Sequence, residues 1–306
     1  MKKVFSAALL MVLLASNYSC QKADEEEVTP IRDFKAQTAF DMQNIEAYLK
    51  SHYIEVVNHP GFSDDMDVTI TKIPTGGSQI SIWNQTEYQL QNYQLNTGYV
   101  QYDVYYLKLR EGSGSNSAAP TNVDSVLASY KGTLLDGTVF DFNPFPQSYF
   151  SLTSTVGGWS RIFPKFKTGS FTENTDGTIT YNDFGAGVMF LPSAFGYYNQ
   201  SLSTIPAYSP LVFSFKLYAI KRADQDADGI LSYLEDINGD GYVNSLDDTD
   251  GDGTADYLDI DDDGDGVITK NEIKDPVTGL PYDYDLIPTC GSTGNGKKKY
   301  LDASCN

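Results

Sequence analysis

Four acidic segments of twelve residues near the C-terminal end constrain this chain more than any other feature. They read DQDADGILSYLE, DINGDGYVNSLD, DTDGDGTADYLD and DDDGDGVITKNE, and they begin at Asp224, Asp236, Asp248 and Asp261. Each has Asp or Asn at positions 1, 3 and 5, Gly at position 6 and an acid at position 12. Alternate side chains and the position-7 carbonyl can then converge on one hard cation, while Gly permits the sharp turn. The pattern predicts four calcium loops in residues 224–272.

The expected ligands are the side chains at positions 1, 3, 5 and 12 of each loop. They are Asp224, Asp226, Asp228 and Glu235; Asp236, Asn238, Asp240 and Asp247; Asp248, Asp250, Asp252 and Asp259; and Asp261, Asp263, Asp265 and Glu272. The first and last loops end in Glu, which is long enough to offer both oxygens, so we expect the two middle loops to bind less tightly. The loops abut, which leaves no room for the helices of paired EF-hands. The array therefore resembles thrombospondin type 3 repeats, and an affinity of roughly 10⁻⁴–10⁻³ M would be typical of an extracellular module.

Charge is concentrated in this same segment. The chain has 41 acidic and 21 basic residues, and 17 of the acids lie in residues 224–272 beside one base, Lys270. That segment thus carries −16 of the net −20, and the rest is nearly balanced. An acidic chain of this kind is a poor partner for nucleic acid. The alternative to a metal-binding array is a solvated acidic tail, which would need no metal.

The first residues predict export and lipid anchoring. Lys2 and Lys3 precede the apolar run 7–14, which is too short to span a bilayer, and Cys20 follows the small residue Ser19. This arrangement resembles a bacterial lipoprotein signal, in which the Cys becomes the lipidated N-terminus; ordinary signal cleavage is the alternative. We therefore expect a signal peptide at residues 1–19, lipidation of Cys20, a tether at residues 20–32, and an outer-membrane anchor facing the periplasm or the cell surface.

The two remaining cysteines, Cys290 and Cys305, lie in the C-terminal segment, residues 273–306. An exported chain meets an oxidising compartment, so we expect them to form a disulfide, with two free thiols as the alternative. Closing a loop of this length would contribute about 3 kcal/mol.

Residues 33–97 have a mixed pattern and no assignable role. Side chains at Met42, Ile45, Leu49 and Tyr53 recur at spacings of three and four and predict a helix over residues 33–53, and the short runs VTITKI and ISIW predict strands. The chain has only two histidines, both in this region, and it lacks a G-x-S-x-G elbow, so Ser/His hydrolase chemistry is improbable.

The segment that follows predicts antiparallel strands. Residues 98–110, 126–134 and 213–220 alternate as strands do, and Asp136-Gly137 suits a tight turn. Ser160 could cap a short helix with an apolar face. The stretch SFTENTDGTITYNDFGAG suggests an additional hairpin that could cover or lengthen one rim of a site.

Four motifs in this segment carry a resemblance: SYKGTLLDGTVFDFN, VGGWSRIFPKF, LPSAFG and STIPAYSPLVFSFKL occur in that order. Together they resemble FKBP-type peptidyl-prolyl cis-trans isomerases across a domain at residues 98–222. The resemblance implies an α+β fold, an antiparallel sheet wrapped on a short helix, here followed by an irregular calcium-loop array. It also implies an aromatic pocket formed by Tyr130, Phe140, Asp141, Val156, Trp159, Phe195, Ile205 and Phe213.

Within that pocket the resemblance implies a role for each residue. Trp159 would form the floor, Tyr130, Phe140 and Phe213 the walls, and Asp141 would face the twisted carbonyl. Val156 would offer a backbone hydrogen bond and Ile205 a loop over the proline. Phe195 stands where the family usually has Tyr, so we expect weakened activity, by about 0.5–1.5 kcal/mol for one lost hydrogen bond. A further aromatic wall would fall near Ser148 or Tyr149.

The implied reaction needs no catalytic cofactor, because the enzyme only has to bind a twisted amide better than a planar one. The expected partners are proline-containing polypeptide clients, calcium ions and a membrane reached through the lipid anchor. Two alternatives remain open: a non-catalytic scaffold that uses the same fold to hold a peptide, and a structural protein whose working part is the calcium array.

Overall fold

The computed structural model describes residues 30–290 and 296–305. The chain separates into two units, Met1–Arg32 and Asp33–Asn306, and the helices and strands below belong to the second. The predicted signal peptide, the lipidated Cys20 and most of the tether lie outside the described residues. Within the described part of the chain, no helix has both the length and the apolar character that crossing a membrane requires.

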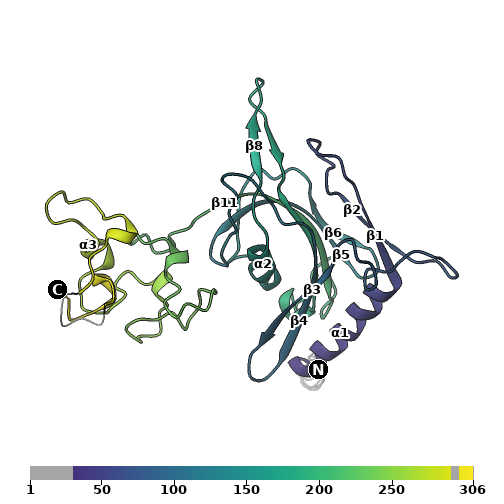
Figure 1. Ribbon diagram of the computed structural model, residues 1–306. Helices are drawn as coiled ribbons and strands as arrows, with labels where there is room; N and C mark the ends of the chain where they lie inside the picture. The colour runs from purple at the N-terminus through teal and green to yellow at the C-terminus, as the bar shows by residue number, and fades with distance from the viewer. Residues whose placement is uncertain (1–29, 291–295, 306) are drawn as a thin grey trace, which may run out of the picture. The chain divides into compact units, whose positions relative to one another are not determined.

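An antiparallel sheet of seven strands is the centre of the fold (Figure 1). The strands pair in the order β3-β4-β10-β11-β5-β6, and β7 pairs with β5. Their bounds are β3 Leu90–Asn96, β4 Gln101–Arg110, β5 Ser125–Leu134, β6 Val139–Asn143, β7 Phe150–Ser151, β10 Gly185–Leu191 and β11 Leu211–Lys221. Because β3 belongs to this sheet, the sheet begins before residue 98, where the sequence placed the domain boundary.

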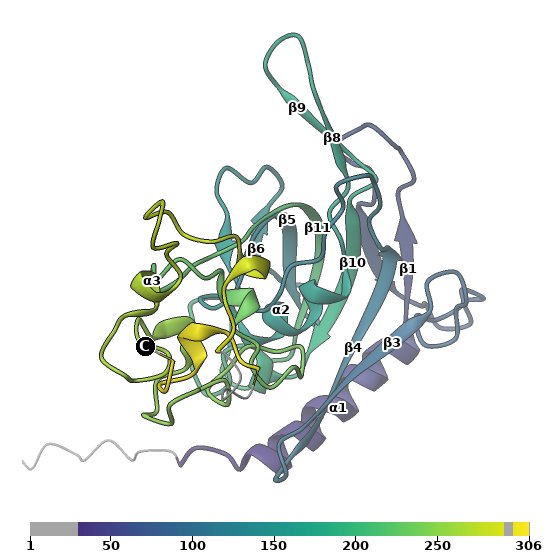
Figure 2. The ribbon, with the colours of Figure 1, turned by 60° about the vertical axis from the view of Figure 1, so that its left-hand side comes forward.

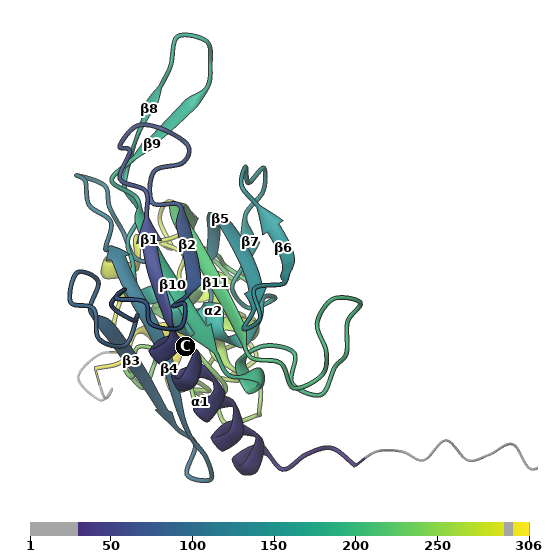
Figure 3. The same ribbon diagram turned by 90° about the vertical axis from the view of Figure 1, so that its right-hand side faces the viewer.

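Apolar side chains cover both faces of the sheet. On β10, Met189 and Leu191 point into one core, whereas Val188 and Phe190 point into the other, as the two-residue period of a strand requires. The first core packs against α2, Gly157–Ile162, and the short helix η1, Phe163–Lys165 (Figure 2). The second packs against α1, Phe34–Ser51, and the small sheet of β1, His52–Val56, with β2, Val68–Lys72 (Figure 3). The molecule therefore has three layers here, with the sheet in the middle.

Helix α1 follows its sequence pattern closely. Asp33 caps its N-terminus by accepting a hydrogen bond from the backbone of Ala36 at 2.9 Å. Ile45, Tyr48 and Leu49 form its buried apolar stripe, and the backbone becomes extended at His52. The helix is therefore held by packing on the sheet.

Three local expectations have different outcomes. The ISIW run at residues 80–83 forms turns instead of a strand, although Ile82 is fully buried. The prediction that Ser160 caps a helix is wrong: it lies inside α2, whose N-cap is Val156, and donates to the carbonyl of Gly157. The additional hairpin is present, formed by β8, Ser170–Glu173, and β9, Ile179–Asn182.

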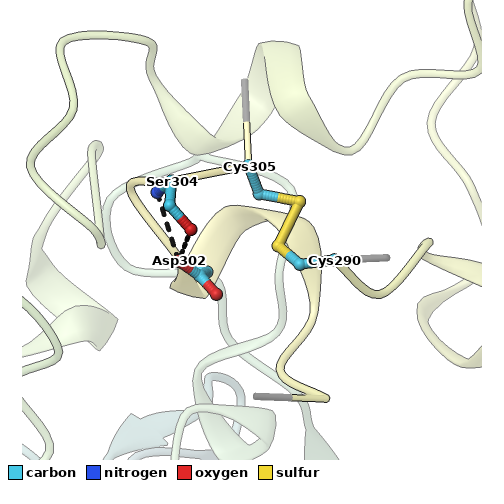
Figure 4. Close-up of a disulfide and its surroundings, with 4 residues drawn as sticks. All are labelled: Cys290, Asp302, Ser304 and Cys305. Carbon is cyan, nitrogen blue, oxygen red and sulfur yellow. Dashed lines mark hydrogen bonds between the residues drawn. A yellow bond between two sulfur atoms is a disulfide. The ribbon is translucent and has the colours of Figure 1, made fainter. Parts of the chain in front are cut away.

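The acidic segment and the C-terminal segment contain only short helices among the described residues. They are η3 Ser232–Leu234, η4 Asp256–Leu258, α3 Thr269–Glu272, η5 Tyr284–Leu286 and η6 Lys299–Leu301; in the domain before them lies η2 Ser193–Phe195. Ile230, Ile273, Ile287 and Tyr300 form a small apolar core that joins the first loop, the end of the fourth loop and the C-terminal segment. Cys290 and Cys305 form a disulfide with their Cα atoms 5.5 Å apart, close to the turn in which Asp302 accepts hydrogen bonds from Ser304 (Figure 4). The array is thus folded onto a core of its own.

Candidate functional site

A hollow of about 960 Å³ opens at one end of the first core, and aromatic rings surround it. Trp159, only 4% exposed, lies at its base. The rings of Tyr130 and Phe213 stand edge-on to it, with centroids 5.0 and 5.5 Å away. Phe140 in turn stands edge-on to Phe213 at 5.4 Å. Edge-to-face contacts of this kind lock each ring by its neighbours, so the walls are rigid.

Two glycines of the sequence motifs make this close packing possible. A Cβ on Gly132, in SYKG, would lie 2.5 Å from the ring of Phe140 and 3.0 Å from that of Phe213. A Cβ on Gly158, in VGGW, would lie 2.4 Å from the side chain of Leu191. Both distances are shorter than van der Waals contact, so each glycine serves close approach.

Among the described residues that line the hollow, Asp141 is the one carboxylate. Its Oδ2 accepts a hydrogen bond of 2.6 Å from the hydroxyl of Tyr130, and its Oδ1 accepts one of 2.8 Å from the backbone N–H of Phe142. Burial, and then the hydrogen bond to Asp141, raises the pKa of Tyr130 well above its usual range. Tyr130 therefore stays protonated at neutral pH and keeps the carboxylate oriented at the rim.

The mouth of the hollow is formed by a loop and by the first turn of α1. Val156, Ile205 and Tyr197 belong to the lining, and Ile205 is 4% exposed. Phe34 of α1 also lines the hollow, and its ring stacks on that of Tyr198 at 4.2 Å with an interplanar angle of 7°. The region without an assigned role thus supplies part of the site.

Helix α1 is also bound to the loop through a buried carboxylate. Asp41, fully buried, accepts hydrogen bonds from the backbone N–H and the hydroxyl of Ser193 at 2.8 and 2.6 Å. It accepts a third from Gln37 at 2.7 Å. Ser193 is the first residue of η2 and is followed by three residues of the lining, Ala194, Gly196 and Tyr197. Charge-assisted bonds of this kind are the stronger class, so Asp41 positions that loop.

The structure brings together seven of the eight predicted pocket residues, and the exception is Phe195. Its side chain is not in the lining; it packs edge-on against Tyr102 at 5.1 Å in the first core. The lining instead includes Tyr197, two residues later. The further wall expected near Ser148 or Tyr149 is Phe150, whose ring lies 5.7 Å from Tyr130 and 5.8 Å from Trp159.

The additional hairpin does not reach this hollow. Its residues Ile179, Thr180 and Tyr181 line a separate hollow of about 320 Å³. Sequence reasoning missed Phe34, Tyr197 and Phe150 for different reasons. Phe34 comes from a distant helix, whereas the other two lie one or two positions from the residues that were singled out.

The acidic loops have the backbone that a cation loop needs. The position-6 glycines, Gly229, Gly241, Gly253 and Gly266, all have positive φ. At position 4 three loops have Gly with positive φ, while the first loop has Ala227 at φ 64°. Glycine at position 6 is therefore required by conformation, because L side chains rarely adopt it.

Carboxylates gather within three of the four loops. Oxygen atoms of positions 1, 3 and 5 lie within 4.8 Å of one another in the first, third and fourth loops. These are Asp224, Asp226 and Asp228; Asp248, Asp250 and Asp252; and Asp261, Asp263 and Asp265. In the second loop Asp236 accepts from the backbones of Asp240 and Gly241, and Asp247 accepts from Asn238 and Asn244. The second loop therefore has its carboxylates engaged by its own chain.

The first and fourth loops contain many buried carboxylate oxygens without a hydrogen-bond partner. They belong to Asp224, Asp226, Asp228, Glu235, Asp261, Asp262, Asp263, Asp265 and Glu272. Burial, and then the neighbouring Asp228, raises the pKa of Glu235 to about 9. Burial, and then Asp256, raises the pKa of Asp262 to about 10. Buried carboxylates are normally paired or metal-bound, so these residues fit a hard cation. Sequence analysis had not selected Asp262, because position 2 is not a ligand position of the motif.

Comparisons with known proteins fall on the same two regions. Residues 225–297 match the family described as BamM C-terminal. The FKBP-type peptidyl-prolyl cis-trans isomerase FkpA of Aeromonas hydrophila is 31% identical over 113 residues, 36% of this chain and 37% of that protein. FkpA of Escherichia coli K12 is 29% identical over 123 residues, 39% of this chain and 38% of that protein. The chain thus spans a little over a third of the length of these relatives, and over that part it is similar in sequence to FKBP-type isomerases.

Two solved structures are similar to this chain, each with a low TM-score. A peptidyl-prolyl cis-trans isomerase of Pseudomonas syringae has 18% identity and a TM-score of 0.36, covering 63% of this chain and 100% of that one. FkpA of Escherichia coli has 26% identity and a TM-score of 0.32, covering 42% of this chain and 51% of that one.

Proposed function

We propose that this chain is a peptidyl-prolyl cis-trans isomerase of the FKBP type. The observation that carries the proposal is the ring-walled hollow around Trp159, with the Tyr130–Asp141 pair at its rim. The partial sequence similarity to FKBP-type isomerases supports it independently.

The chemistry follows from the nature of the amide. Rotation about a peptide bond has a barrier of about 18–20 kcal/mol because the C–N bond is partly double. Twisting removes that conjugation and lowers the amide dipole. A pocket of rings replaces water around the planar amide, whose larger dipole loses more on desolvation than that of the twisted one. The site thereby binds the transition state better than the ground state, which is the condition for catalysis.

Each group in the hollow has a task in this mechanism. The proline ring would lie on Trp159 between Tyr130 and Phe213, and Asp141 would face the carbonyl carbon, which becomes more electrophilic on twisting. Val156 would contribute its backbone and Ile205 would close over the proline. Proton transfer is not required, and the high pKa of Tyr130 agrees with a hydrogen-bonding role.

The decisive experiment is a protease-coupled assay on an X-Pro peptide with the wild-type chain, Asp141→Ala and a control. We expect Asp141→Ala to lower kcat/KM by roughly 10- to 100-fold, as the loss of charged hydrogen bonds worth about 1.5–3 kcal/mol implies. Asp176→Ala is the matched control, because Asp176 lies in the β8–β9 turn, away from the hollow, and accepts hydrogen bonds from the nearby Thr178. A wild-type rate equal to the uncatalysed background would refute the proposal, and peptide binding without turnover would favour the scaffold alternative.

We further propose that residues 224–272 bind calcium through the position 1, 3, 5 and 12 side chains. The buried, unpartnered oxygens of the first and fourth loops support this, as do the gathered carboxylates of the third. Calorimetric titration of the full chain with calcium should show uptake near millimolar concentration, strongest in the first and fourth loops. Absence of heat up to ten millimolar (about ten times the upper end of the expected range) would refute it.

We place the protein in the envelope of a Gram-negative cell, lipid-anchored through Cys20, where it would act on exported proline-containing clients. The lipoprotein-like N-terminal sequence and the origin of the relatives in Aeromonas and Escherichia support this placement. Metabolic labelling with a fatty acid, absent in Cys20→Ser, tests the anchor.

A further inference from the structure

Three carboxylates from two different acidic loops meet inside the array. Asp228 and Glu235 belong to the first loop, and Asp262 comes from position 2 of the fourth. One oxygen of each lies within 4.8 Å of the others. The three residues are 1%, 0% and 1% exposed, so this cluster is cut off from solvent.

None of the free oxygens in the cluster has a hydrogen-bond donor. Both oxygens of Glu235, both of Asp262 and Oδ2 of Asp228 are buried and unpartnered. The remaining oxygen of Asp228 accepts from the backbone of Ile230 at 2.7 Å. The salt bridges found among the described residues include none of the three. Five buried carboxylate oxygens of this cluster therefore lack a hydrogen-bond donor.

The side chain at position 2 forms a hydrogen bond within its own loop in the first and third loops, whereas that of Asp262 in the fourth loop does not. In the first loop Gln225 bonds to the position-9 side chain of Ser232, and in the third Thr249 donates to the position-9 side chain of Asp256. Asp256 is as buried as Asp262, yet Thr249 satisfies both of its oxygens. The contrast shows that the array can pair a buried acid with donors where no cation is needed.

We infer that Asp228, Glu235 and Asp262 hold a divalent cation, and that Asp262 is a ligand by which the fourth loop closes onto the first. This inference rests on the calcium binding proposed above for the array. Buried like charges at this separation repel strongly, and a metal ion is the usual way to compensate them. Neighbouring contacts already bring the two loops together: Lys270 donates to the carbonyl of Ala227, and Ile230 shares an apolar core with Ile273.

Calcium is the cation that the ligand set fits. Five free oxygens, two each from Glu235 and Asp262 and one from Asp228, would supply most of the six to eight oxygen ligands that calcium takes, and calcium tolerates irregular geometry. Magnesium would demand a near-octahedral site and would keep several waters, for which a cluster this buried is poorly suited. The cation would stabilise a contact between residues far apart in the sequence.

The test is a double-mutant cycle on the full chain with calcium alone as the probe. Asp262→Asn should bind one calcium ion fewer by equilibrium dialysis, or hold it with a dissociation constant at least about tenfold higher. Glu235→Gln should lose the same ion, so the double variant should lose no more than either single variant. Combining Asp262→Asn with Asp252→Asn of the third loop should lower calcium binding by the sum of the two single effects.

Thermal unfolding provides a second readout, in which the effect of Asp262→Asn on the melting temperature reverses between calcium and chelator. In calcium, Asp262→Asn should melt below the wild type; in chelator it should melt above it, because a neutral amide costs less to bury without a cation than a carboxyl group does. Additive losses in the Asp262–Glu235 pair, or normal calcium uptake by Asp262→Asn, would overturn this inference alone. A wild-type chain that takes up no calcium would overturn it together with the calcium proposal.

Discussion

Asp41 offers the sharpest test of whether helix α1 belongs to the site. The substitution is Asp41→Ala, which deletes the acceptor of three hydrogen bonds at 2.6–2.8 Å and leaves the buried Ser193 N–H without that partner. Hydrogen bonds to charged groups contribute about 1.5–3 kcal/mol each and are not additive. Because each buried donor left unsatisfied costs about 1–3 kcal/mol and these costs are not additive, we expect the free energy of unfolding to fall by roughly 2–4 kcal/mol.

The assay combines denaturant unfolding, followed by the fluorescence of Trp83 and Trp159, with isomerase kinetics. Because Ser193 leads into the lining, a displaced loop should lower kcat/KM about tenfold or more under conditions where the variant is still folded. Asp41→Asn should be milder, since one amide oxygen can still accept from Ser193. Glu46→Ala, at a half-buried position of the same helix that pairs with Lys50 and accepts a long hydrogen bond of 3.5 Å from Tyr105, should cost about 1 kcal/mol or less.

A loss below about 1 kcal/mol for Asp41→Ala would refute the reasoning, since it would mean that these bonds are replaced without penalty. A loss of stability of the expected size together with an unchanged kcat/KM would separate the effect of Asp41 on stability from its effect on the hollow. In that case Asp41 would hold α1 in place without positioning the lining.

Three further predictions concern other parts of the molecule. Gly132→Ala should lower kcat/KM several-fold in the X-Pro assay because its Cβ would displace Phe140; wild-type kinetics would contradict this. Ala227→Gly should raise the calcium-loaded array's unfolding free energy by about 1 kcal/mol, since φ is 64° there, and no increase in its melting temperature would refute it. Burial raises the pKa of Tyr48 to about 12 from 10.0. Between pH 10 and about pH 12 the Tyr48 hydroxyl is deprotonated in the unfolded chain but still protonated in the folded one. The free energy of unfolding should therefore fall by up to about 1.4 kcal/mol per pH unit in this range. In urea titrations at pH 10 and 12, Tyr48→Phe should show a smaller fall than the wild type.

The sequence predicted the sheet well because its strands alternate and its turns carry recognisable residues. The strand expected at residues 126–134 is β5, Ser125–Leu134, and the one expected at 213–220 is β11, Leu211–Lys221. The pocket was predictable for a different reason: Tyr130, Trp159 and Phe213 lie in motifs that resemble those of FKBP-type isomerases, and Gly132 and Gly158, near the first two, allow close packing. Both kinds of signal are local.

The features that sequence reasoning missed depend on contacts between distant residues. Phe34 reaches the hollow only because α1 packs on the far face of the sheet and extends past its edge, and no local pattern encodes that. Phe195 was assigned to the pocket by its motif, but the backbone at η2 turns it into the core and presents Tyr197 instead. A loop motif does not identify Asp262, because the carboxylates close to it, Asp228 and Glu235, belong to another loop.

The small core around Tyr300 has a consequence for the order in which the chain can mature. The last strand of the large sheet ends at Lys221, so that sheet can assemble while later residues are still being synthesised. Ile230, by contrast, must wait for Tyr300 before its core is complete. The ring-walled hollow can therefore be ready before the C-terminal segment has finished folding, and that segment contains Pro276, Pro281 and Pro288. X-Pro bonds in an unfolded segment isomerise over roughly tens to hundreds of seconds, so the completion of this small core can lag behind that of the sheet.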